Sequence, residues 1–178
     1  MNLDKAQRLL KHLWLDVSDA QRAIPKDALE RLALRIAASE ARHTGQIRIC
    51  VEAALPTSYL WRINRSTSPS ELVRQRALMV FGKLRVWDTE HNNGVLIYLQ
   101  LAEKAIEIIA DRALSRLVSA PDWLAMTARM RTAFREGRFE EGLTQALEEV
   151  SALLVAHFPA AAGGVQVNEL PNAVVVLG

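Results

Sequence analysis

A nearly unbroken apolar run, GVLIYLQLA at residues 94–102, constrains the fold of this chain more than any other feature. A short apolar run of this kind is typical of a strand buried on both faces of a sheet. A second strand-like run, AIEIIAD at 105–111, follows after Glu103 and Lys104, and this spacing favours a tight antiparallel hairpin. We therefore expect a sheet that contains this hairpin and is entered through the polar stretch before residue 94.

A third strand is predicted within GQIRICVEAAL at residues 45–55, where apolar and partly polar positions alternate. The segments around the strands show helical spacing of apolar residues. One helix has a clear start signal, because Ser68 can cap it, Pro69 suits its first position and Glu71 lies three residues after the cap. We expect helices at residues 3–15, 25–44, 69–84, 112–118, 121–137 and 139–157.

The order of these elements predicts an α/β fold in a single domain. A β-α-β crossover and the antiparallel hairpin would form a small mixed sheet that is flanked by helices. Residues 1–24 are predicted to form an N-terminal amphipathic helix and linker, 25–159 the α/β domain, and 160–178 a flexible C-terminal tail. The apolar end of that tail could lie against its own domain or add an edge strand to a neighbouring subunit, which would give a homo-oligomer.

Composition and charge narrow the class of protein. The formal charge of +2 over 178 residues is too small for a general nucleic-acid binder. The single cysteine, Cys50, cannot form an internal disulfide and lies in an apolar run, so it is expected to be buried. The N-terminus has no long apolar stretch, and we expect a cytoplasmic protein.

The predicted helix at residues 3–15 has one apolar face with charges largely elsewhere. It could dock on its own domain or lie on an anionic membrane. Its apolar face consists of Leu3, Ala6, Leu10, Leu13 and Trp14.

Polar residues from three segments are expected to gather at one edge of the sheet. If the first two strands run parallel, both begin at the same edge, and the hairpin brings Asp111 back to it. The expected group consists of Glu40, His43, Asp88, Glu90, His91, Asn92, Asn93 and Asp111. Carboxylate and amide oxygens suit calcium or magnesium, while the histidines keep zinc or manganese open. The alternative is structural, because Asn-Asn-Gly also suits a turn and Asp88 could cap one.

Basic residues are concentrated in the segment between the first two strands. They could form a solvated face or a surface that binds anions. They are Arg62, Arg65, Arg74, Arg76, Lys83 and Arg85. Strong local catalytic motifs, such as a nucleophile elbow, a Walker loop or a His-Glu-x-x-His zinc motif, do not occur in the sequence.

Three stretches together resemble the TPM domain family, which is also known as TPM phosphatase and includes YgcG-like proteins. They are SEARHTGQIRICVEAAL, NNGVLIYLQLAEKAIEIIAD and FREGRFEEGLTQALEEVSALLVAHFP, and the resemblance covers about residues 25–159. RVWDTEHNNGVLIYL and NELPN are similar to a compact bacterial subgroup. The resemblance implies a mixed sheet flanked by helices, divalent-cation binding in some members and phosphatase activity in a plastid branch. Asn92 stands where the family has an acidic residue.

Two functions remain open from the sequence. One is a binding module with a weak divalent-cation site, which engages a protein partner; the resemblance implies a LemA-type membrane protein as one such partner. The other is a metal-assisted phosphatase, with His43 or His91 as general acid or base and Arg112 as the phosphate clamp. The expected metal ligands are Glu40, Asp88, Glu90, Asn92 and Asp111. Contact of the N-terminal helix with a membrane surface is a third possibility.

Overall fold

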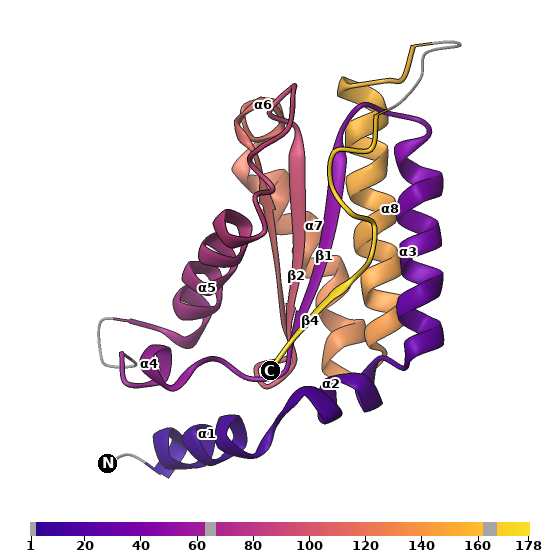
Figure 1. Ribbon diagram of the computed structural model, residues 1–178. Helices are drawn as coiled ribbons and strands as arrows, with labels where there is room; N and C mark the ends of the chain where they lie inside the picture. The colour runs from indigo at the N-terminus through magenta and orange to yellow at the C-terminus, as the bar shows by residue number, and fades with distance from the viewer. Residues whose placement is uncertain (1–2, 63–66, 162–166) are drawn as a thin grey trace.

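The computed structural model has a four-stranded mixed sheet at its centre, with the strand order β3-β2-β1-β4 (Figure 1). It describes residues 3–62, 67–161 and 167–178, and the side chains from residue 7 onward. The strands are β1 (Gln46–Glu52), β2 (Gly94–Gln100), β3 (Ala105–Ala110) and β4 (Val175–Leu177). β2 runs parallel to β1 and antiparallel to β3, so the predicted α/β fold with a crossover and a hairpin is confirmed.

Helices cover both faces of the sheet (Figure 1). They are α1 (Leu3–Trp14), α2 (Val17–Ala23), α3 (Lys26–Glu40), α4 (Thr57–Leu60), α5 (Pro69–Lys83), α6 (Arg112–Ser115), α7 (Ala120–Arg135) and α8 (Phe139–His157). α5 lies on one face, while α3, α7 and α8 form a layer on the other. The predicted start of α5 is confirmed, because Ser68 and Glu71 form a reciprocal capping box.

The apolar run of β2 explains why the sheet is covered on both sides. Its side chains alternate, so that Val95 and Ile97 pack with α3, α7 and α8, while Leu96 and Tyr98 pack under α5. Every residue of β1 and β2 is buried. Cys50 is among them, and its burial raises the pKa of its thiol to about 12, which leaves it unreactive as a thiolate.

The N-terminal helix docks through a face that the apolar pattern did not predict. Leu10, Leu13 and Trp14 are 56%, 63% and 81% exposed, while Leu9 packs against the domain and His12 is buried. The side chains of Leu3 and Ala6 lie outside the described residues. The helix thus docks on its own domain, as expected, but through Leu9 and His12, because the buried polar contacts of His12 set the orientation of α1.

The C-terminal segment belongs to its own sheet. Val175–Leu177 pairs parallel with β1, and Gln46 accepts hydrogen bonds from the backbone N–H groups of Glu169 and Leu170 at 2.9 and 3.0 Å. Arg48 donates to the carbonyl oxygens of Pro171 and Ala173. The flexible tail expected over 160–178 is thus replaced, across 167–178, by a segment fixed through side chains of β1. None of the helices in the described ranges has the length and apolar character to cross a membrane.

Candidate functional site

The starts of β1 and β2 and the end of β3 meet at one end of the sheet, as the topology predicted. Gly94 pairs with Gln46, and the Asp111 N–H donates to the Gly94 carbonyl oxygen at 2.9 Å. The side-chain amide of Asn93 donates to Thr44 Oγ1 at 3.2 Å, which ties the second strand to the first. We call this end of the sheet the polar corner.

Backbone requirements account for part of the Asn-Asn-Gly sequence at the polar corner. Asn92 has a φ of 51°, a left-handed conformation that asparagine tolerates better than most residues. A Cβ atom on Gly94 would overlap the backbone carbonyl of Val86, so only glycine fits there. The structural interpretation of these residues as turn chemistry therefore has direct support.

Glu40 and His43 are buried next to α8 and the C-terminal segment, and both have hydrogen-bond partners. Glu40 accepts from the Ile47 N–H at 2.9 Å, and burial raises the pKa of its carboxyl group to about 7. His43 Nδ1 donates to the Gly45 carbonyl oxygen at 3.0 Å, and Nε2 lies 2.9 Å from Ser39 Oγ. Burial lowers the pKa of this imidazole to about 4, so it is neutral near pH 7 and both ring nitrogens are occupied.

Asp88, Glu90 and His91 lie in the exposed loop before β2. Asp88 pairs with Arg85, three residues earlier in the chain. The Glu90 N–H donates to Glu169 Oε2 at 2.7 Å, which holds the loop against the C-terminal segment. These contacts give the loop a structural role at the surface.

Asn92, Asp111 and Arg112 are brought together. Asn92 Oδ1 accepts from Arg112 Nε at 2.9 Å, and its backbone carbonyl accepts from Ala113. Asp111 Oδ1 caps α6 by accepting from the Arg112 N–H at 2.7 Å, whereas Asp111 Oδ2 is buried without a hydrogen-bond partner among the described residues. Arg112 thus occupies the amide oxygen that had been expected to bind a metal.

The five expected metal ligands do not fit one closed cation cage. Asp88 lies in the exposed loop and pairs with Arg85, whereas Asp111 caps α6 next to the contact between Asn92 and Arg112. Glu40 lies beyond β1, against Ile47 and Asn172. Within residues 3–62, 67–161 and 167–178, no three His, Cys, Asp or Glu side chains are grouped so that they could hold a metal ion.

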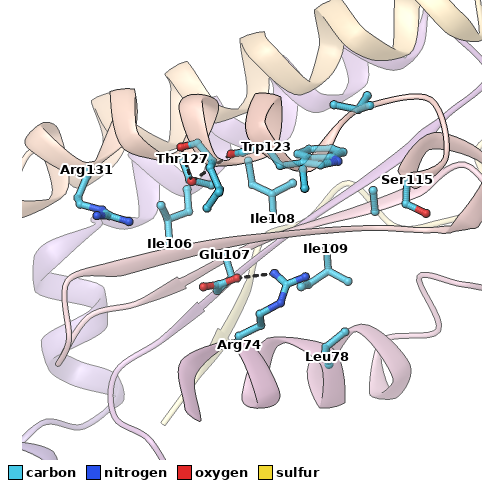
Figure 2. A pocket seen from close by; sticks show the side chains of 14 residues that line it. Arg74, Leu78, Ile106, Glu107, Ile108, Ile109, Ser115, Trp123, Thr127 and Arg131 are labelled. Atoms are coloured by element: carbon cyan, nitrogen blue, oxygen red, sulfur yellow. Dashed lines mark hydrogen bonds and ion pairs between the residues drawn. The ribbon is translucent and has the colours of Figure 1, made fainter. Parts of the chain in front are cut away.

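A groove runs beside β3, between α5 and α7 (Figure 2). Its volume is about 530 Å³, and Ile106 and Ile108 form its floor. Trp123, Thr127 and Arg131, each four residues apart on α7, form one wall, and Arg74 and Leu78 on α5 form the other. Arg74 reaches across to Glu107 with an N···O distance of 2.9 Å. We call this feature the β3 groove.

A family model for the TPM domain matches residues 17–153. The chain belongs to the TPM domain family. The structure is similar to the NMR structure of BA42 protein from the psychrophilic bacterium Bizionia argentinensis, with a TM-score of 0.70 and 25% sequence identity over 86% of this chain and 94% of that one. Among curated proteins, none matches this sequence.

Sequence reasoning on this TPM domain missed the β3 groove. Trp123 is partly buried against the core and also lines the groove. The sequence carried no local signal for this groove, because the position of β3 at the edge of the sheet depended on where the last strand pairs. Arg74 was recognised within the basic segment, in which Arg65 lies outside the described residues.

Proposed function

We propose that this TPM domain is a binding module that docks a protein partner in the β3 groove. The observation that carries the proposal is a groove between two helices whose walls carry exposed apolar side chains above the floor of Ile106 and Ile108. Leu78 and Leu124 beside it are 49% and 68% exposed. Apolar surface gathered along a groove and bordered by charges is typical of a protein interaction site.

The contacts at the polar corner favour binding over phosphatase chemistry. A general acid or base must reach a substrate, but both ring nitrogens of His43 have partners inside the domain. Arg112, the expected phosphate clamp, bonds to Asn92. These side chains would have to leave their present contacts before they could act on a phosphomonoester.

A photo-reactive amino acid at position 124 tests the binding proposal in cells. We expect cross-links to a defined partner from position 124 but not from position 34 on α3, where Leu34 is 70% exposed. Adding Leu78→Glu to the reactive protein should reduce the yield, because the charge lies on the opposite wall of the groove. Equal cross-linking from positions 124 and 34, or a yield unaffected by Leu78→Glu, would refute the proposal.

The partner itself is open to a directed test. The family resemblance makes a LemA-type membrane protein the first to examine, through the same cross-linking position. Co-expression of the two proteins should give a cross-link at position 124 if they meet in the groove.

We also propose a weak divalent-cation site at Asp111, supported by the buried Oδ2 atom without a partner. Magnesium keeps several water ligands and is bound through one or two carboxylates, and calcium also prefers oxygen ligands. Calorimetric titration with calcium, magnesium, manganese and zinc should give heat that Asp111→Asn removes. Asp88→Asn, at an exposed carboxylate paired with Arg85, should leave it unchanged. Absence of heat from all four ions would rule the site out.

A further inference from the structure

We propose that the β3 groove takes an extended, acidic segment of the partner, which adds to the free edge of β3 as a fifth strand. This inference rests on the proposed binding function and specifies its mode. Its basis is the backbone of β3, the two helix walls and the arrangement of charge along them.

The hydrogen-bond register leaves every second residue of β3 facing outward. Asp111 and Gly94 form a hydrogen-bonded pair, since the Asp111 N–H donates to the Gly94 carbonyl oxygen. In an antiparallel ladder such pairs alternate with non-bonded ones, so Ile106 and Ile108 turn their N–H and C=O groups away from β2. Among the described residues, none has a hydrogen bond to these groups of Ile106 or Ile108. They offer the pairing pattern that an incoming strand needs.

The strand β3 itself also lacks the features that usually protect a sheet edge. Exposed edges are commonly blunted by a proline, a bulge, an inward charge or a very short strand. β3 has six residues in regular register with β2 and contains no proline. Its only charged side chain, Glu107, is directed to α5 and paired with Arg74. The opposite edge, β4, has only three residues.

The two walls leave the edge accessible while covering both faces of a strand added there. An added strand lies about 4.8 Å from its neighbour, and its side chains alternate between the two faces of the sheet. Side chains on one face would meet Trp123 and Thr127 of α7, and those on the other would meet Leu78 of α5 (Figure 2). The groove therefore provides contacts for both sets of side chains.

Charge divides the β3 groove into two halves. Arg131 lies by Ile106, and Arg74 lies by Glu107, whereas Trp123 and Leu78 border the half that contains Ile108 and Ile109 (Figure 2). Arg131 has no ion-pair partner within the described ranges. Two arginines against one glutamate leave an excess positive charge, so the partner segment should be acidic at one end and apolar at the other.

Binding of a short labelled peptide tests this inference. The probe has valine alternating with threonine in one half and glutamate alternating with threonine in the other, and a second probe has the two halves in reverse order. We expect saturable fluorescence anisotropy for one of the two orders. Hydrogen exchange followed by NMR should slow at the amides of Ile106 and Ile108, because these would then donate to the peptide.

Control experiments distinguish strand addition from binding that uses side-chain contacts alone. N-methylation of alternate peptide amides should abolish binding without changing a side chain. Replacing the glutamates with lysines, or Arg131 with glutamate, should weaken binding by about tenfold or more at low salt. Lys26→Glu, the same charge change on α3 and far along the chain from the groove, should have no effect.

The outcomes distinguish this inference from the proposed function. Specific cross-linking at position 124 without slowed exchange at Ile106 and Ile108 would refute strand addition and leave the binding function in place. Binding that tolerates N-methylation, or that prefers lysine peptides, would also overturn it. Failure of the cross-linking, with peptide binding and protection intact, would reject the cellular partner role while retaining the peptide site.

Discussion

The buried groups Glu40 and His43 are expected to have opposite effects on how the free energy of unfolding depends on pH, so that the two effects partly cancel. Folding raises the pKa of Glu40 from 4.5 to about 7, so its contribution to the free energy of unfolding falls as pH rises through that window. Folding lowers the pKa of His43 from 6.5 to about 4, so its contribution rises with pH over 4 to 6.5. Because both shifts arise mainly from burial, the two slopes oppose each other over most of the same range.

Replacing Glu40 with glutamine should remove one of these slopes. Glutamine keeps an oxygen that can accept from the Ile47 N–H but does not ionise. Relative to the wild type, Glu40→Gln should gain stability between pH 4.5 and 7, by at most about 3 kcal/mol. Urea unfolding of both proteins across this range measures the difference. Parallel stability curves would mean that the Glu40 carboxyl group keeps its ordinary pKa in the fold.

For individual residues, the sequence predicted which polar residues lie at the same end of the sheet, but not which hydrogen-bond partner each of them has. Alternation and strand order were sufficient to bring Asp111 to the start of β2. They could not show that Arg112 bonds to Asn92, or that His43 is occupied by Gly45 and Ser39, because such contacts depend on side-chain rotamers and on the packing of α8.

Among the elements, α1 depends on a polar anchor for its position. His12 Nδ1 accepts from the Leu55 N–H at 3.0 Å, and Nε2 donates to Glu103 Oε1 at 2.9 Å. Arg8 contacts the same Glu103 oxygen at 2.9 Å. A helix of this length is marginal when isolated, so its order should depend on docking.

His12→Ala should release α1 without unfolding the sheet. The substitution leaves the buried Leu55 N–H without its acceptor, which costs about 1–3 kcal/mol. Hydrogen exchange should therefore accelerate across residues 7–14 while the amides of β1 and β2 keep their protection. Lys11→Ala, at an exposed position of the same helix, serves as the control. Unchanged exchange in α1 after His12→Ala would show that apolar contacts alone hold the helix.

Periodicity and capping identified most of the larger elements, since α5, α8, β1, β2 and β3 follow strong local patterns. The sequence did not predict α2, whose capping box uses Asp16 and Asp19, because only a short helix follows it. It also left open where the last strand pairs. The pairing of this strand with β1 depends on Gln46 and Arg48, whose side chains hydrogen-bond to the backbone of the C-terminal segment. In the sequence alone, these two residues look like ordinary polar positions of a strand.

For the molecule as a whole, the C-terminal segment closes one side of the sheet and should govern both stability and self-association. Removing residues 167–178 would expose the outer edge of β1 and leave Gln46 and Arg48 without the backbone groups they bind. It would also remove buried Leu170, whose side chain alone contributes about 2 kcal/mol.

We expect a lower melting temperature and concentration-dependent association in analytical ultracentrifugation, since an unpaired strand edge is a template for pairing between chains. A peptide spanning 167–178, added in trans, should restore the monomer and raise the melting temperature, whereas the same peptide with Leu170→Glu should not. If the truncated chain stays monomeric and equally stable, then β4 contributes little to closing the sheet, and the helical layers alone maintain the fold.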